Sequence, residues 1–303
     1  MRSKRPTPED KAHRVIPSLY IPGQPLDTER MTGRPTRFWK YHGLGNDFII
    51  MDRREDGDLS AESVRKVCDR HRGVGADGIL AALTSDDGQL FMRVFNADGS
   101  LADMCGNGLR CFVRWAVDVL GVPSEDSIAI GSDAGEQVCR LIPQEEPAEP
   151  LVEVNLGEAQ FHGERTVSID GRPFTGEVLL LGNPHFVLRG PPQTGDVAMF
   201  GPRISTHPSF PNGTNVEWLD VQSPNHANVL VCERGVGPTQ ACGTGGAGAC
   251  AVGVRWQELV PEATVTVVQP GGPLTYRVAS DFSSVWMCGP AVPIYTGAVT
   301  IAP

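Results

Sequence analysis

Cys105-Gly106-Asn107-Gly108 and Cys242-Gly243-Thr244-Gly245 are two copies of one short motif, and they decide how this 303-residue chain is organised. Each copy follows a strand-like run and opens a helical pattern. Each also lies nine residues after a polar residue that ends the strand, Asn96 in the first half and Glu233 in the second. This repetition predicts a duplicated α/β unit, one in each half of the chain.

The motif also predicts a pair of equivalent thiols. A cysteine at a helix N-terminus has its thiolate stabilised by unpaired backbone N–H groups and by the helix dipole. If Cys105 and Cys242 face one cavity, one thiol can remove a proton from one face of a carbon while the other protonates the opposite face. The pattern therefore favours an enzyme that inverts a carbon centre.

Composition narrows the possible partners. The chain is 40% hydrophobic and 20% charged, which is ordinary for a globular protein, and its length allows two domains with real cores. A net charge of −10 argues against binding to a nucleic-acid backbone, and no apolar run is long enough for a membrane span. We therefore expect neither a nucleic-acid nor a membrane partner.

Residues 1–37 differ from the rest of the chain. They carry eight Lys/Arg, four Asp/Glu and six prolines without clear periodicity, so we expect an N-terminal extension outside the catalytic fold. Pro17, Pro22 and Pro25 interrupt the one stretch that could serve as a signal peptide, and the default expectation is a cytoplasmic protein.

Alternating and helical periodicities predict a mixture of strands and helices beyond that extension. The clearest helix follows Cys105, where an apolar stripe runs to Leu120 and Gly121 ends it. A second helix, over about 244–259, is rich in Gly and Ala, so we expect it to lie centrally where close packing excludes larger side chains. Strands are expected at 38–42, 46–52, 79–83, 91–95, 152–156, 166–169, 178–181, 216–221, 227–232, 274–278, 285–288 and 292–301, with a helix from 61 to 72 and a linker at 143–150.

Each candidate residue also has an ordinary structural explanation. A single Cys-Gly-x-Gly is more typical of a buried structural cysteine, and we assign that role to Cys68, Cys139, Cys232, Cys250 and Cys288. His185 could be a satisfied histidine at a strand end, and Glu233 with Arg234 could form a surface ion pair. No Cys-x-x-Cys pair or phosphate-binding loop is present, so we expect no metal and no nucleotide site.

Seven segments, taken together and in order, resemble the diaminopimelate epimerase family: His42–Phe48, Asp69–Gly78, Phe95–Ser100, Met104–Cys111, Gly182–His185, Glu233–Gly237 and Ala241–Gly245. The resemblance covers about residues 38–303. It implies an α/β (α+β) fold of two pseudo-symmetric domains, each a strand barrel around a central helix, with the active site in the cleft between them. The implied domains are 38–151, which carries Cys105 and is completed by about 287–303, and 152–286, which carries Cys242.

The resemblance further implies conversion of LL-2,6-diaminopimelate to the meso form, for lysine and cell-wall precursor synthesis, without pyridoxal phosphate, metal or any other cofactor. Cys105 and Cys242 would be the acid and base, with His185 and Glu233 helping to set their protonation states. The helix N-termini would hold the reacting carboxylate through Gly106, Asn107, Gly243 and Thr244, and Asn46 would contact the same end. The distal amino-acid end would be held by Asn96, Asn183, Asn215 and Arg234.

Two features depart from some relatives, and three points stay open. Gly78 stands where those relatives carry a substrate-contacting Gln, so we expect no contact there, and the 37-residue extension is unusual. A related cofactor-independent racemase of another amino acid, such as proline, is an alternative, although Asn107, Asn215 and Arg234 favour a substrate with a second amino-acid end. A non-catalytic binding protein on the same scaffold is the other alternative. The sequence does not decide the oligomeric state, and a homodimer is one option.

Overall fold

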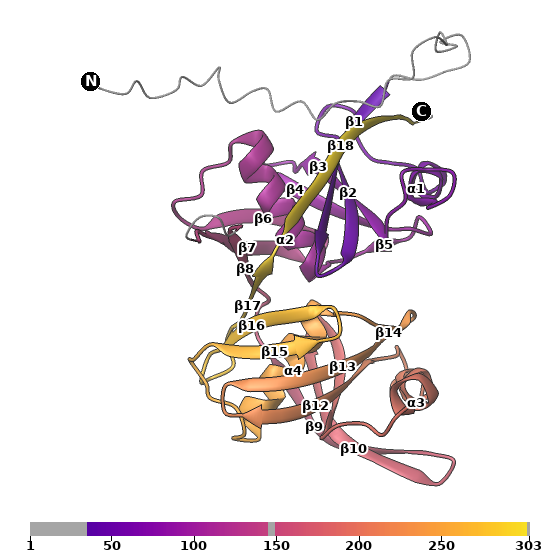
Figure 1. Ribbon diagram of the computed structural model, residues 1–303, viewed down its shortest axis with the longest axis vertical. Helices are drawn as coiled ribbons and strands as arrows, with labels where there is room; N and C mark the ends of the chain where they lie inside the picture. The colour runs from indigo at the N-terminus through magenta and orange to yellow at the C-terminus, as the bar shows by residue number, and fades with distance from the viewer. Residues whose placement is uncertain (1–34, 145–148, 302–303) are drawn as a thin grey trace.

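A computed structural model describes residues 35–144 and 149–301 of the chain. Figure 1 shows two bodies stacked along the long axis, joined where β8 and β17 lie. Residues 1–34 of the expected extension, and part of the expected linker, lie outside the described residues. Residues 35–37, which were assigned to the extension, instead form the start of strand β1 (Pro35–Gly43). Their backbone pairs with strand β18 (Val292–Thr300), a role that needs no apolar side chain.

The first body contains the elements that precede residue 156, together with β18. Its elements are β1, β2 (Asn46–Asp52), α1 (Ala61–Cys68), β3 (Gly78–Thr84), β4 (Leu90–Asn96), β5 (Leu101–Ala102), α2 (Gly106–Trp115), the π-helical turn η3 (Ala116–Leu120), β6 (Ile128–Ser132), β7 (Gly135–Ile142) and β8 (Leu151–Asn155). Gly121 ends this helical segment in the left-handed conformation, as expected from the sequence.

The second body repeats the same order of elements. It contains β9 (Gln160–Ile169), β10 (Arg172–Leu181), β11 (Asn183–Arg189), α3 (Asp196–Ser205), β12 (Asn215–Ser223), β13 (His226–Glu233), β14 (Gly237–Thr239), α4 (Gly243–Arg255), β15 (Val265–Gln269), β16 (Gly272–Val278) and β17 (Val285–Pro290). Helix α4 ends four residues before the expected position, and Gln257 just beyond it has a positive φ of 60°.

Strand pairing is the same in the two bodies. The parallel pairs β2–β3 and β4–β6 of the first body correspond to β11–β12 and β13–β15 of the second. The hairpin β4–β5, which leads from Asn96 to Cys105, corresponds to β13–β14, which leads from Glu233 to Cys242. The duplicated unit expected from the two motifs is therefore confirmed at the level of topology.

One strand from the second half of the chain belongs to the first body. β18, from the end of the chain, pairs with β1 of the first body, and the corresponding β9 pairs with β10 of the second. Between the bodies, β8 pairs with β17 in an antiparallel ladder from Leu151–Pro290 to Asn155–Trp286. One sheet of 18 strands therefore runs through both bodies.

One helix lies inside the strands of each body. α2 contacts β1, β2, β4, β7, β8 and β18, and α4 contacts β10 to β13 and β15 to β17. Every residue of α4 from Gly243 to Val254 is buried. A Cβ at Gly246 would stand 2.3 Å from the Tyr276 hydroxyl oxygen, and one at Gly253 would stand 2.5 Å from Leu259. The glycines of α4 are therefore required by close packing, as the sequence predicts.

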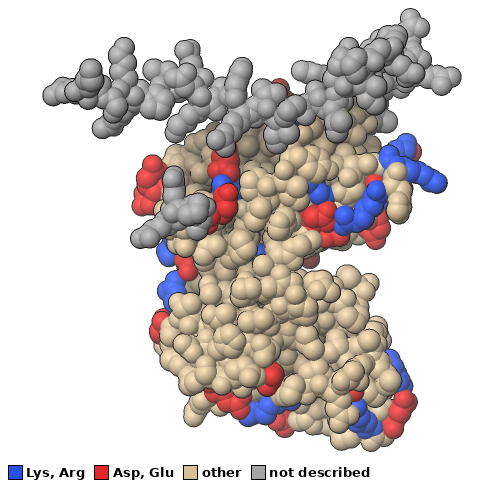
Figure 2. Space-filling model, in the orientation of Figure 1, with Lys and Arg blue, Asp and Glu red and all other residues tan. Residues whose placement is uncertain are grey.

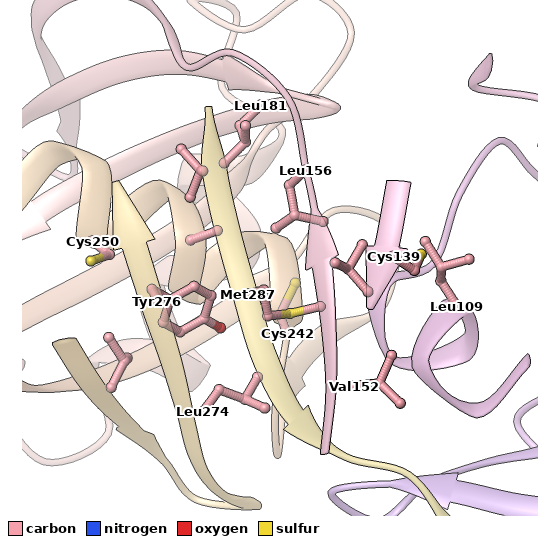
Figure 3. Packing of buried hydrophobic residues seen from close by; sticks show 14 of the residues in the cluster. Leu109, Cys139, Val152, Leu156, Leu181, Cys242, Cys250, Leu274, Tyr276 and Met287 are labelled. Carbon is pink, nitrogen blue, oxygen red and sulfur yellow. The ribbon is translucent and has the colours of Figure 1, made fainter. Parts of the chain in front are cut away.

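The core around α2 continues without a break into the core around α4. Figure 3 shows this layer, with Leu274 and Tyr276 of β16 on one side, Leu109 and Val152 of the first body on the other, and Met287 between them. The two helix N-termini are thus held against each other by one buried, close-packed layer.

Candidate active site

The two bodies enclose a cleft of about 1040 Å³. Figure 2 shows the surface notched between them, on the side where Figure 1 places α1 and α3. The first body lines the cleft from β1 to the Cys105 turn, and the second lines it with the β13–β14 hairpin. Five of the residues expected at the site lie in its lining, namely Asn46, Asn96, Cys105, Glu233 and Arg234.

Cys105 and Cys242 occupy equivalent positions at the N-termini of the two central helices. Each is the N-cap residue in an extended conformation, and each sulfur accepts a hydrogen bond from the backbone N–H three residues on. The Gly108 N–Cys105 Sγ distance is 3.4 Å, and the Gly245 N–Cys242 Sγ distance is 3.3 Å. A Cβ at Gly108 would stand 3.6 Å from the Cys105 sulfur, and one at Gly245 would stand 3.3 Å from the Cys242 sulfur. The Cys-Gly-x-Gly pattern is therefore a cap in which sulfur takes the place that oxygen usually has.

The two capped turns meet around one methionine. A Cβ at Gly106 would lie 3.1 Å from the Met287 methyl carbon, and one at Gly243 would lie 2.8 Å from its sulfur. Asn107 also crosses between the bodies, because its Nδ2 donates to the carbonyl oxygen of Ala241, the residue before Cys242, at 3.4 Å. The structure thus brings the four expected helix-terminal positions to one place.

Burial and the helix N-termini act in opposite directions on the two thiols. Burial raises the pKa of Cys105, and the negative charge of Glu233 adds to that rise, while the Gly108 N–H and the Arg110 guanidinium lower the pKa. Burial raises the pKa of Cys242 further, with Glu233 and Glu217 adding to it. The Thr244 hydroxyl, 3.5 Å from the Cys242 sulfur, and the Gly245 N–H lower it. Without substrate, both thiols therefore favour the protonated form more strongly than the motif alone predicts.

The Cys242 turn is held by buried groups that the sequence did not identify. Gln269 accepts from the backbone N–H of Cys242 at 2.8 Å and donates to its carbonyl oxygen at 3.2 Å. The Tyr276 hydroxyl donates to the carbonyl oxygen of Gly243 at 3.0 Å. Both side chains are nearly fully buried, and neither lies in a motif, so only the tertiary structure reveals them.

Three of the residues expected at the distal end of the substrate form one cluster. Asn215 donates through Nδ2 to Asn183 Oδ1 at 3.0 Å and accepts through Oδ1 from the backbone N–H of Arg234 at 2.8 Å. The exposed Arg234 guanidinium donates to the carbonyl oxygen of Asn212 at 3.2 Å. No carboxylate in the described part of the chain forms an ion pair with Arg234, so its remaining donors are suited to an external carboxylate.

Asn46 lies beside Cys105 at the other side of the cleft. Its Nδ2 donates to Asp77 Oδ2 at 2.8 Å, which turns its Oδ1 toward Cys105 Sγ, 4.0 Å away, and toward Asn107 Nδ2, 3.2 Å away. Asp77 is itself paired with Arg70. Asn96, at the end of β4, lines the cleft and donates to the Ser100 hydroxyl.

His185 lies deeper than the sequence suggests. It is fully buried on β11, packs against Gly248 of α4, and its Nδ1 lies 2.7 Å from Oε1 of the equally buried Glu217. Burial raises the pKa of Glu217, and the contact with His185 lowers it. No hydrogen bond from His185 to either cysteine occurs in 35–144 or 149–301. Glu217 was not identified from the sequence, in which it stands between Val216 and Trp218 of the strand expected at 216–221.

Glu233 ends β13 in the cleft, where its Oε1 accepts from the Thr239 hydroxyl at 2.6 Å. Its charge acts on both cysteines, which fits a residue placed between them.

Several further expectations concern residues outside this cluster. A Cβ at Gly78 would lie 2.4 Å from the Phe95 carbonyl oxygen, so a larger side chain would meet the neighbouring strand there, and the absence of a substrate contact stays a prediction. Cys68, Cys111, Cys139, Cys232 and Cys250 are buried free thiols, and Cys288 is partly buried. Within the described residues, no group of three potential metal ligands occurs and no helix is long and apolar enough to cross a membrane.

Comparisons with known proteins agree with this geometry. A family model described as diaminopimelate epimerase matches residues 38–162 and 178–294. A diaminopimelate epimerase of Synechococcus sp. (strain JA-3-3Ab) is 38% identical over 86% of this chain and 96% of the relative. A putative chloroplastic diaminopimelate epimerase of Oryza sativa subsp. indica is 35% identical over 88% of this chain and 80% of the relative.

Solved structures share the fold at low identity. A PhzF-family phenazine biosynthesis protein of Bacillus anthracis aligns with a TM-score of 0.68 at 18% identity, over 88% of this chain and all of that one. A probable proline racemase of Agrobacterium radiobacter K84 aligns with the same TM-score at 12% identity, over 88% of this chain and 94% of that one. On the family match and the sequence identities together, this chain belongs to the diaminopimelate epimerase family.

Proposed function

We propose that this chain interconverts LL- and meso-2,6-diaminopimelate by a proton transfer between two thiols on opposite faces of one α-carbon. The observation that carries the proposal is the pair of matching sulfur N-caps, Cys105 and Cys242, on the two central helices. Cys105 lines the cleft, whereas Cys242 is buried next to Ala241, which lines it. Family membership supports the substrate and the reaction, and it makes the chain an isomerase of lysine and cell-wall precursor biosynthesis.

The proton transfer needs no proton acceptor or donor other than the two sulfurs. A thiolate on one face takes the α-proton, and the C–H electron pair remains on carbon as a carbanion. The thiol on the other face then gives its proton to that carbon, so the centre is inverted and the two sulfurs exchange protonation states. The reverse reaction uses the same two groups with their roles exchanged.

The helix N-termini would stabilise the negative charge. The α-carboxylate would lie between the two turns, where Gly106 and Asn107 of α2 and Gly243 and Thr244 of α4 present backbone N–H groups. These positions are buried, so the donors act in a low dielectric, where they stabilise an enolate-like carbanion strongly.

The remaining polar residues have positions suited to binding the rest of the substrate. Arg234, held by Asn215 and Asn183, would bind the distal carboxylate, and Asn96 would complete that end. Asn46 would contact the reacting end beside Cys105. Glu233 acts on the charge of both cysteines, and His185 would act on the Cys242 side through Glu217.

We also propose that the two bodies are the two domains of the family. Strand pairing supports a first domain formed by β1 to β8 with β18, and a second formed by β9 to β17. The boundaries expected at 151 and 287 fall at the first residue of β8 and inside β17. The cytoplasmic location and the homodimer remain predictions, and light scattering tests the second.

Isotope incorporation tests the proposed function. In deuterated water, early product formed from LL-diaminopimelate should carry one deuterium at the inverted centre, because the protonating thiol has exchanged with solvent. Recovered substrate should carry little, and the distal centre none. Substantial transfer of the original hydrogen into product would refute the two-thiol scheme.

Cys105→Ala and Cys242→Ala are the matched variants, and each should abolish turnover without unfolding the protein. A panel with proline, hydroxyproline and histidine separates the alternatives. Turnover of one of these in place of diaminopimelate would identify a related racemase, and turnover of none would indicate a binding protein.

A further inference from the structure

Arg110 is a fully buried cation that has no anionic partner in the part of the chain that the structure describes. It lies on α2, five residues after Cys105, and its side chain has no exposed surface. Its three contacts are to neutral acceptors: Nε donates to the Pro290 carbonyl oxygen at 3.2 Å, Nη1 to Met287 Sδ at 3.3 Å and Nη2 to Asn107 Oδ1 at 3.0 Å. Among residues 35–144 and 149–301, no Asp or Glu forms an ion pair with it. Such a charge is destabilising unless another group balances it.

A chain of hydrogen bonds connects Arg110 to the Cys105 sulfur. Arg110 donates to Asn107 Oδ1, Asn107 Nδ2 donates to Asn46 Oδ1 at 3.2 Å, and Cys105 Sγ lies 4.0 Å from the same oxygen. The orientation of the Asn107 amide is fixed by this arrangement. Asn46 Oδ1 and the Ala241 carbonyl oxygen are both acceptors, so Asn107 must turn its NH₂ toward them, and Arg110 is the donor that its oxygen needs.

Arg110 also joins the two bodies. Asn107 carries one connection across to Ala241, and the guanidinium itself holds Met287 and Pro290 of β17. Met287 is the side chain that packs between Gly106 and Gly243. One guanidinium therefore supports both cysteine turns.

The charges around the two cysteines are unequal. Cys105 has Arg110 on its own helix, whereas Cys242 has the buried Glu217, whose Oε1 lies 3.0 Å from a Cβ built at Gly245. Glu233 acts on both sulfurs. The other ionisable groups facing Cys105 or Arg110 are His42, Asp77, Asp98 and Arg234 around the cleft and Cys111, Tyr276 and Cys288 in the core.

We propose that Arg110 is a positioning residue of the epimerase, whose hydrogen bond fixes the Asn107 amide between the two turns and whose buried charge makes Cys105 easier to deprotonate than Cys242. The inference rests on the proposed function, since it ranks the two thiols of that site. It predicts that Cys105 loses its proton at a lower pH than Cys242 in the substrate-free enzyme.

The experiment measures the alkylation rate of each cysteine by iodoacetamide against pH, with peptide mapping by mass spectrometry. In the unmodified enzyme, Cys105 should react with a lower pH midpoint than Cys242. In Arg110→Met the Cys105 midpoint should rise by about 1 pH unit, the order of shift that follows from removing a nearby opposite charge. The Cys242 midpoint should move by less than half as much.

Three further variants separate charge, hydrogen bonding and general damage. Arg110→Gln removes the charge but keeps an amide donor for Asn107, and it should shift the Cys105 midpoint as Arg110→Met does while losing less kcat. Arg110→Lys keeps the charge and should shift the midpoint least. Arg114→Met is the matched control on the same helix, because Arg114 is already neutralised by Asp118 and Glu149, and it should leave the midpoint unchanged.

Folding of each variant is checked by circular dichroism, and if Arg110→Met does not fold, the Gln and Lys pair tests the same point. A Cys105 midpoint that is equal in unmodified, Gln and Lys proteins would overturn the proposal. So would a lower midpoint for Cys242 than for Cys105 in the unmodified enzyme. Alkylation is measured without substrate, so a failure of diaminopimelate turnover would refute the proposed function and leave this test intact.

Discussion

Gly246→Ala adds one methyl group at the most crowded position of α4. The new Cβ would lie 2.3 Å from the Tyr276 hydroxyl oxygen, 2.9 Å from Tyr276 Cζ and 3.0 Å from Gln269 Nε2. Tyr276 is buried and holds the Gly243 carbonyl oxygen, and Gln269 holds the backbone of Cys242. Because neither side chain can move without releasing the Cys242 turn, the substitution should affect stability and catalysis together.

The expected magnitude follows from three opposing effects. Overpacking costs about 1–3 kcal/mol, and losing the Tyr276–Gly243 hydrogen bond costs about 1 kcal/mol more. Replacing Gly by Ala inside a helix returns about 1 kcal/mol. The free energy of unfolding should therefore fall by about 1–3 kcal/mol, measured by urea denaturation. A displacement of about 1 Å at the Gly243 turn should lower kcat by roughly 10- to 100-fold.

Tyr276→Phe is the matched partner for this substitution, since it removes the hydroxyl that the new methyl group meets. In a double-mutant cycle, Gly246→Ala should cost at least about 1 kcal/mol less in the Phe background than alone. A Gly246→Ala protein that is more stable than the unmodified protein and has the same kcat would refute this expectation. Strict additivity of the two substitutions would refute it equally.

Three further outcomes are expected. Glu217→Gln should lower the pH midpoint for alkylation of Cys242 and leave that of Cys105 in place, because the carboxylate raises the pKa of Cys242; a shift of Cys105 alone would contradict this. Oxidation of the substrate-free enzyme should link Cys105 to Cys242 and stop turnover until reductant is added, and inactive protein with both thiols free on peptide mapping would argue against it. Burial raises the pKa of Cys250 from 9.0 to about 12, so between these pH values the folded chain keeps a proton that the unfolded chain loses. The free energy of unfolding should therefore fall as pH rises from about 9 to 12. The fall should be less steep in Cys250→Ala.

Features carried by repeated or locally constrained sequence were predictable. Local residues predicted three features that the structure shows. These are the two cysteine turns, the end of the first central helix at Gly121 and the close packing of α4. Strands β4 and β13 end at Asn96 and Glu233, as the motif spacing predicts.

Features set by distant contacts were not predictable. Helix α3 contains Gly201 and Pro202, which lower helix propensity, and it forms because Phe200 and Ile204 pack among buried residues from the strands of the second body. The strands β6, β7, β11 and β15 were also missed. Gln269, Tyr276 and Glu217 reach the cysteine turn only through strand pairing, so no local pattern identifies them.

The pairing of β18 with β1 has a consequence for how the protein is made. β1 precedes the rest of the first body in the sequence, yet its outer partner β18 follows the entire second body, so that Pro35 finds Thr300 only after the second body has been translated. Until then, one edge of β1 is without its strand and open to wrong partners, and contacts this distant in sequence form slowly. The second body has no such delay, because β9 is the immediate neighbour of β10. We therefore expect the nascent chain to acquire its second half first and its first half last, so that Cys105 reaches its working position only after Cys242 has done so.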